Sequence, residues 1–316
     1  MKKFALGFAI ILFACTTNAM ASTTLNILAA GTLAFPFKQI DAAFQKKYPD
    51  INVEPRFGGS VKMVKMVTEL HQPADVIAVA DYSVIPKYLF GDKKNQPYTN
   101  WYVGFAGNAI TFVYTENSKG ADQINSSNWY KILSQPGVQI GRSNPDTDPS
   151  GYQTVQMLNL ASQYYGAPEL EQHLLANAPI SNMRDTETDL ISALQVGQID
   201  YLAIYHSDAL QHHFKYLDLP AQINLSNPAY SSIYAKGNAM TKNGLMTGKP
   251  IVYAITILNN SAHKDAAQKY VAFLLGPVGQ TIMKKNGFIQ IDPAFAMNRN
   301  KMPKSLQKLV KSWPKT

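Results

Sequence analysis

The chain has 316 residues, of which 46% are hydrophobic, and a formal net charge of +8. It is long enough for two domains of ordinary size, since single hydrophobic cores stop growing at roughly 250–300 residues. The basic residues form no stripe interleaved with aromatic residues, which argues against a nucleic-acid-binding protein.

The first 21 residues have the composition of an export signal. Two lysines precede an apolar run from Phe4 to Ala14, and this run is too short to span a membrane. Small residues follow, and cleavage after Ala21 would release a protein that begins at Ser22. We therefore expect a signal peptide at residues 1–21 and a soluble periplasmic protein.

An alternative interpretation of the leader is a lipoprotein signal. The stretch from Leu12 to Cys15 resembles a lipoprotein cleavage site, at which Cys15 would be lipidated, although Phe13 is bulkier than such sites usually tolerate. Cys15 is also the sole cysteine of the chain, so no internal disulfide can form. An exported domain without disulfides depends on its hydrophobic core for stability.

Strand, polar turn and helix follow one another in the first 80 residues. We expect short buried strands at residues 25–29, 51–55 and 75–79. Apolar residues at helical spacing follow the first two strands, at residues 33–48 and 61–71. Alternating strands and helices of this length predict a mainly parallel sheet covered by helices.

Two later segments, residues 101–115 and 249–258, have the composition of long strands that carry the chain between two lobes. A second α/β unit lies between them, and two further helices follow. The sequence therefore predicts an α/β protein whose two lobes are joined by a two-strand hinge. We expect lobe 1 to comprise residues 22–103 plus 247–316, and lobe 2 residues 104–246.

The second unit contains the stretch SNPDTDPSGYQT, residues 143–154. Asp146, Asp148, Ser150 and Gly151 have the spacing that opens a calcium loop, but the twelfth residue of such a loop must be a bidentate glutamate. Here the twelfth residue is Met157, which excludes that motif. The simplest interpretation is a turn whose polar side chains cap a helix.

Hydroxyl residues precede four of the predicted helices, at Thr32, Ser60, Ser150, and Thr186 or Thr188. Helix N-termini bind oxyanions through free backbone N–H groups and the helix dipole, without needing a lysine or arginine. In open α/β sheets these helix ends meet at the carboxyl edge of the strands, where ligands bind. Each hydroxyl taken alone is equally well explained as a cap of its own helix.

The order of several segments resembles a known family. The segments are AAGTLAFPFKQIDAAFQKKYPD, EPRFGGSVKMVKMVTELHQPADVIAVADYSVIP, GRSNPDTDPSGYQT, ETDLISALQVGQIDYLAIY, LPAQINLSNPAY and GKPIVYAITI. Together they resemble the periplasmic molybdate/tungstate-binding proteins of ABC importers, in particular the tungstate-selective branch. The resemblance covers nearly the whole mature chain. It implies a type II periplasmic solute-binding fold, and we expect a monomer that delivers a small oxyanion to the membrane permease of an ABC transporter.

The resemblance also implies the site residues. The family's oxyanion contacts fall on Gly31, Thr32 and Ser60 in lobe 1, and on Asp148, Pro149, Ser150, Glu187 and Tyr205 in lobe 2. In this branch two carboxylates approach the metal of the oxyanion, and they correspond to Asp148 and Glu187. A hexavalent molybdenum or tungsten centre is a hard, oxygen-seeking cation that can accept such additional ligands.

The chain departs from the family pattern at several of these positions. Thr32 stands where serine is usual, Ser150 where cysteine is usual, and Gln153 where arginine is usual. Thr186 likewise replaces a lysine. These changes leave the preference between tungstate and molybdate open.

Other classes of function are less consistent with the residues. The chain lacks a G-x-S-x-G elbow, a phosphate loop and an H-E-x-x-H pair, so we expect no enzyme and no cofactor. His206, His212 and His213 lack the further ligands of a metal site. A receptor for sulfate, phosphate or an organic anion, or an exported interaction module, remains an alternative on the same fold.

Overall fold

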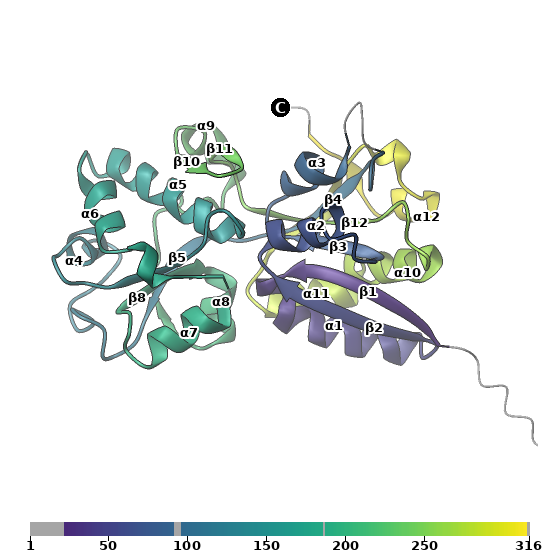
Figure 1. The fold of residues 1–316 in the computed structure, drawn as a ribbon, viewed down its shortest axis with the longest axis horizontal. Helices are drawn as coiled ribbons and strands as arrows, with labels where there is room; N and C mark the ends of the chain where they lie inside the picture. The colour runs from purple at the N-terminus through teal and green to yellow at the C-terminus, as the bar shows by residue number, and fades with distance from the viewer. Residues whose placement is uncertain (1–21, 92–95, 186, 315–316) are drawn as a thin grey trace, which may run out of the picture.

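The structure is a computed structural model that describes residues 22–91, 96–185 and 187–314. The expected signal peptide, with Cys15, lies outside these residues. Within them the chain forms two lobes, each built around its own sheet (Figure 1). The predicted α/β class is confirmed, whereas the residue boundaries of the lobes stay a prediction.

Lobe 1 contains a sheet of seven described strands in the order β14-β13-β4-β12-β3-β1-β2. The strands are β1 (Thr23–Ala30), β2 (Ile51–Gly58), β3 (Val76–Val79), β4 (Tyr102–Gly107), β12 (Val252–Ile257), β13 (Ile289–Met297) and β14 (Lys311–Ser312). Strand β1 is parallel to β2 and β3, but β12 is antiparallel to β3 and β4. The expectation of a mainly parallel sheet is therefore wrong. Neighbouring β4 and β12 run in opposite directions because one leads the chain out of the lobe and the other brings it back.

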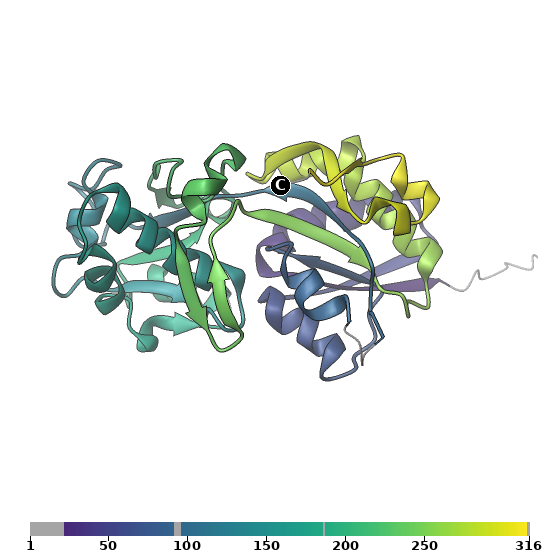
Figure 2. The same cartoon turned by 90° about the horizontal axis from the view of Figure 1, so that it is seen from above.

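Helices cover this sheet on both sides (Figures 1 and 2). They are η1 (Gly31–Leu33), α1 (Ala34–Lys47), α2 (Ser60–Thr68), α3 (Val84–Leu89), α10 (Lys264–Leu275), α11 (Pro277–Lys285), η4 (Arg299–Lys301) and α12 (Lys304–Gln307). Helix α1 buries Phe37, Ile40 and Phe44, as the helical spacing predicts, against Tyr270 of α10. Helix α2 ends before Leu70, which was expected on its apolar face and is instead 65% exposed.

Lobe 2 contains a mixed sheet of five described strands in the order β7-β6-β8-β5-β9. They are β5 (Ile110–Tyr114), β6 (Ile140–Ser143), β7 (Met183–Arg184), β8 (Tyr201–Tyr205) and β9 (Lys215–Tyr216). Around them lie α4 (Trp129–Leu133), α5 (Pro149–Tyr164), α6 (Leu170–Ala176), η2 (Ile180–Asn182), α7 (Glu187–Gln195), α8 (His206–Gln211), η3 (Pro228–Tyr230) and α9 (Ser231–Tyr234). A hairpin of β10 (Asn238–Thr241) and β11 (Gly244–Thr247) completes the lobe.

Two segments cross between the lobes (Figure 2). The expected long strand at 101–115 is interrupted at Asn108, where β4 of one sheet ends and β5 of the other begins. The Asn108 amide is buried and donates to the Ser207 hydroxyl at 2.8 Å, and its carbonyl accepts from the Ala109 N–H at 3.0 Å. These bonds satisfy the polar groups where the chain leaves the sheet.

The second crossing lies just before β12. The Ile251 N–H donates to Leu225 of lobe 2, and the next carbonyl, that of Val252, accepts from Tyr82 of lobe 1. Of the expected strand at 249–258, only Val252–Ile257 is β-strand. Among the described residues, none of the helices combines the length and the apolar character that crossing a membrane requires.

Candidate binding site between the lobes

The loop before α5 shows how the two aspartates of SNPDTDPSGYQT are used. Asp148 is the N-cap of α5, and its Oδ1 accepts the Ser150 backbone N–H at 2.9 Å, with Pro149 at the first helical position. Asp146 points elsewhere and accepts the Lys242 backbone N–H at 2.8 Å from the β10–β11 hairpin. The predicted helix cap is confirmed, and the two carboxylates have separate tasks.

A cavity of about 380 Å³ lies between the lobes and includes Asp148 in its wall. Lobe 1 contributes Gly31, Ala34, Phe35, Phe57, Gly58 and Gly59, and lobe 2 contributes Asp148, Asp185, Ile191, Ser192, Gln195, Asp208, Gln211 and His212. The described residues that line it thus include three carboxylates, and none of them is a lysine or arginine. Electrostatically, this wall does not favour a free anion.

The lobes touch directly at the edge of this cavity. A Cβ atom on Gly59 would lie 2.4 Å from the Thr147 carbonyl oxygen and 3.2 Å from Cβ of Asp148. The Lys62 backbone N–H, in the first turn of α2, also donates to the Thr147 carbonyl at 3.3 Å. The N-terminus of α2 and the loop before α5 are therefore in contact, and the structure is that of a closed cleft.

Three of the predicted hydroxyl groups are buried behind the cavity wall. The Thr32 hydroxyl lies 2.9 Å from the Tyr253 hydroxyl, and the Ser60 hydroxyl oxygen accepts the Ala80 N–H at 2.9 Å. This second bond does not use the Ser60 hydroxyl proton. The Tyr205 hydroxyl, at the end of β8, donates to Gln153 Oε1 at 2.7 Å. Each hydroxyl is thus fixed in direction by a buried partner.

The protonation states follow from this burial. Burial raises the pKa of Asp148, and the hydrogen bonds from Ser150 only partly offset it. Burial also raises the pKa of Tyr205 well above its usual value, and the nearby Tyr253 and Asp148 add to the shift. Tyr205 therefore remains a neutral O–H donor over the physiological pH range.

The structure brings most of the predicted residues to the junction of the lobes. Gly31 and Asp148 line the cavity, whereas Thr32, Ser60, Pro149, Ser150 and Tyr205 are buried next to lining residues or to one another. Glu187 begins α7, but its side chain lies outside what the structure describes, as does Thr186. The predicted second carboxylate is therefore placed only by its backbone.

The sequence analysis missed four polar residues near the site: Asn108, Gln153, Asp208 and Tyr253. Tyr253 comes from β12, and its hydroxyl joins Thr32 to the Asn108 amide, which lies 3.3 Å away. A tyrosine in an otherwise apolar strand was the available signal, since a buried hydroxyl needs a partner.

The three histidines do not converge. His212 lines the cavity and contacts the Phe35 ring of lobe 1 at 5.1 Å, while His206 packs on Tyr216. In the part of the chain that the structure describes, no group of three or more His, Cys, Asp and Glu could hold a metal ion.

Comparison with known proteins identifies the family. A family model described as bacterial extracellular solute-binding protein matches residues 25–289. The chain belongs to this family. An uncharacterized solute-binding protein of Petrotoga mobilis is 41% identical over 288 residues, covering 89% of this chain and 88% of the relative. Solute-binding proteins of this kind are non-enzymatic components of transport systems.

Two further relatives are named by their ligands. A molybdate/tungstate-binding protein, WtpA, of Pyrococcus abyssi is 33% identical over 343 residues, covering 98% of both chains. The solved periplasmic molybdate-binding protein of Azotobacter vinelandii is similar with a TM-score of 0.61 and 17% identity, covering 84% of this chain and 99% of that one. At that identity the likeness shows the fold alone, which is that of type II periplasmic binding proteins.

Proposed function

We propose that this solute-binding protein captures molybdate or tungstate between its lobes and delivers the ion to the permease of an ABC transporter. In this proposal lobe 1 comprises residues 22–103 plus 247–316 and lobe 2 residues 104–246. The protein acts as a monomer in the periplasm after loss of residues 1–21; anchoring through Cys15 is the alternative form of the same receptor.

The observation that carries the proposal is the carboxylate of Asp148 in a closed cleft without a lining cation. Sulfate and phosphate offer only acceptor oxygens, so a carboxylate beside them is repulsive. Molybdate and tungstate differ because their hard metal centre can accept further oxygen ligands. The same carboxylate that disfavours sulfate then becomes a ligand.

The surrounding groups have complementary tasks in this proposal. The N-termini of η1, α2 and α5 direct backbone N–H groups and positive dipole ends toward the cleft, where they stabilise oxo groups. Thr32, Ser60, Ser150 and the neutral Tyr205 supply hydroxyl donors. Asp148 and Glu187 approach the metal itself, one from each of two helix starts in lobe 2. The Pyrococcus abyssi relative, similar over almost the whole chain, supports this assignment.

The decisive experiment is calorimetric titration of Asp148→Asn and Glu187→Gln with tungstate, molybdate and sulfate. We expect the affinity of both variants for tungstate and molybdate to fall by about tenfold or more, because an amide oxygen is a poorer ligand for a hard metal than a carboxylate. Sulfate binding should stay weak or improve, since a repelling charge is removed.

Asp185→Asn is the matched control. Asp185 lines the same cavity but accepts a hydrogen bond from the Asn144 amide at 3.1 Å, so this variant removes an equal charge without removing a proposed metal ligand. X-ray absorption at the tungsten edge counts the oxygen ligands directly. Four oxygens at the metal, or equal losses in Asp148→Asn and Asp185→Asn, would contradict the proposed coordination.

A further inference from the structure

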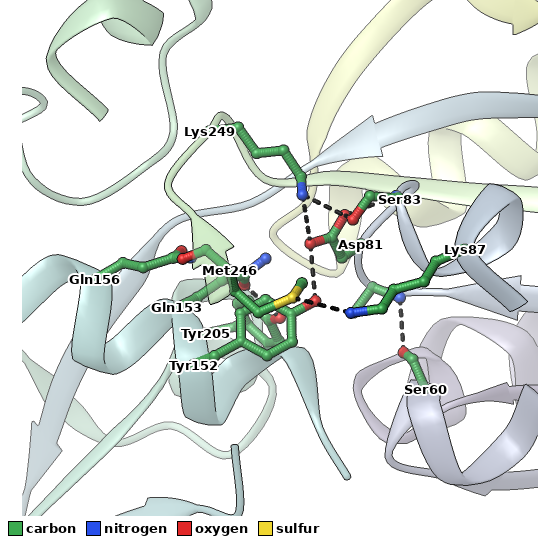
Figure 3. Close-up of polar contacts among 11 residues, drawn as sticks. Ser60, Asp81, Ser83, Lys87, Tyr152, Gln153, Gln156, Tyr205, Met246 and Lys249 are labelled. Carbon is green, nitrogen blue, oxygen red and sulfur yellow. Dashed lines mark hydrogen bonds and ion pairs between the residues drawn. The ribbon is translucent and has the colours of Figure 1, made fainter. Parts of the chain in front are cut away.

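A buried ion pair joins the two lobes beside the cleft (Figure 3). Asp81 follows β3 in lobe 1, and its side chain is 1% exposed. Lys249, in the segment that crosses between the lobes, places its Nζ 3.0 Å from Asp81 Oδ2. The Tyr152 hydroxyl, from α5 of lobe 2, donates to the same oxygen at 2.8 Å.

The other oxygen of Asp81 is also satisfied. Both the backbone N–H and the hydroxyl of Ser83 donate to Oδ1 at 2.8 Å, and Lys249 Nζ donates to the Ser83 hydroxyl at 2.7 Å. Burial alone would raise the pKa of Asp81, but the charge of Lys249 and the bonds from Ser83 and Tyr152 outweigh it and lower the pKa. Asp81 is thus a buried, ionised and fully hydrogen-bonded carboxylate.

These bonds differ in what happens when the lobes separate. Asp81 and Ser83 lie in one turn of lobe 1, and that turn is tied to the crossing segment by the hydrogen bond from the Tyr82 N–H to the Val252 carbonyl, 3.0 Å. The ion pair with Lys249 can therefore persist in an open form. Tyr152 is the member from lobe 2, so its bond to Asp81 must break on opening and form again on closing.

Tyr152 is also well placed to act on the binding site. It lies in the first turns of α5, four residues after the N-cap Asp148. A bond from Tyr152 to lobe 1 holds this end of α5 against the edge of β3, and it holds Asp148 with it. Because the acceptor is a buried carboxylate, the bond is charge-assisted and stronger than a neutral one.

We propose that the Tyr152–Asp81 hydrogen bond is a closure latch, which stabilises the closed form and slows release of the bound ion. The latch rests on the proposed function only for its effect on release. Its effect on the lobes is a property of the protein without ligand, because Tyr152, Asp81 and Lys249 all lie outside the cavity wall.

The test uses Tyr152→Phe, which removes one oxygen atom and keeps the ring. Spin labels are attached at Lys46→Cys in lobe 1 and Val196→Cys in lobe 2, both exposed, in a Cys15→Ser background that leaves no other cysteine. We expect the ligand-free wild-type chain to populate the closed inter-label distance and Tyr152→Phe to deplete it. A distance distribution without the closed form in the wild type, or one unchanged in Tyr152→Phe, overturns the latch even if tungstate does not bind.

Release kinetics provide the second measurement. Tungstate and molybdate should dissociate from Tyr152→Phe about tenfold faster, by the same factor for both ions, since the hydroxyl holds the lobes and not the metal. Lys87→Gln is the matched control because the Lys87 ammonium also bridges the lobes, donating to the Asn243 carbonyl at 2.7 Å from an exposed position. Its effect should be less than about twofold. Equal effects of the two variants, or a change that differs between tungstate and molybdate, contradict the proposal.

Discussion

At the scale of single residues, Asp41 is a carboxylate that the fold buries away from the binding site. It lies on α1, and its Oδ1 accepts the Tyr270 hydroxyl of α10 at 2.7 Å. Burial raises the pKa of Asp41 to about 6, although the bond from Tyr270 acts in the opposite direction. The folded state therefore binds a proton at Asp41 more tightly than the unfolded state does.

This shift predicts how stability depends on pH. A carboxyl group with a raised folded-state pKa contributes its full stability below the unfolded-state pKa of 3.8, and that contribution is lost as pH rises through about 6. Asp41→Asn should remove this loss and raise the free energy of unfolding at pH 7.5 by about 1–3 kcal/mol, with little gain at pH 4. Urea denaturation at the two pH values measures the difference.

The exposed Asp50 provides the control for this comparison. Asp50→Asn removes the same charge a few residues beyond the end of α1, at an exposed position, and should change the free energy of unfolding little at either pH. A gain in Asp41→Asn that is equal at pH 4 and pH 7.5 would show that the effect does not come from ionisation of Asp41.

At the scale of secondary-structure elements, closure depends on how closely α2 approaches the loop before α5. Gly59 is the N-cap of α2 and has a φ of −55°, so its backbone would accept an alanine without strain. The added methyl group would instead meet the Thr147 carbonyl oxygen of the opposite lobe at 2.4 Å. Glycine is required here by the contact between lobes and not by the turn.

Gly59→Ala should therefore weaken tungstate binding by about tenfold or more while leaving the melting temperature of the ligand-free protein nearly unchanged, because the open form has no clash. Gly58→Ala is the matched control, since its methyl group would meet the flexible end of Met63 within the same lobe. Titration and thermal unfolding of both variants test this. Equal affinity losses in the two variants, or normal binding by Gly59→Ala, would contradict a closing cleft.

At the scale of the whole molecule, the two lobes carry opposite net charges. Residues 22–103 plus 247–316 contain 20 Lys and Arg against 9 Asp and Glu, whereas residues 104–246 contain 7 against 12. The overall positive charge therefore hides an acidic lobe 2 that faces a basic lobe 1. Opposite net charges attract, and salt screens the attraction over a Debye length of about 10 Å at 0.1 M ionic strength.

This asymmetry predicts that low salt favours closure. The ligand-free protein should show a larger closed fraction at about 10 mM than at about 300 mM ionic strength, measured by the same inter-label distances or by small-angle scattering. Sucrose at equal osmolality is the control, since it changes the solvent without screening charge. A closed fraction that rises with salt would show that local contacts dominate over the net charges.

The sequence by itself determined the features that depend on neighbouring residues. The Asp148 cap, the buried face of α1 and the existence of two α/β units follow from spacing over a few residues, and local patterns encode such features directly. The family resemblance rests on the same kind of ordered motifs, and family membership is confirmed by the matching model. The proposed metal contact of Glu187 stays a prediction.

Only the tertiary structure decided the features that join distant parts of the chain. The sequence could not indicate that β12 lies antiparallel to its neighbours, because strand direction depends on where the chain re-enters the lobe. Nor could it pair Asp81 with Tyr152, 71 residues apart, or Thr32 with Tyr253, 221 residues apart. Each of these polar groups has many conceivable partners in the sequence. Burial in the closed fold leaves each of them near the one that satisfies its hydrogen bond.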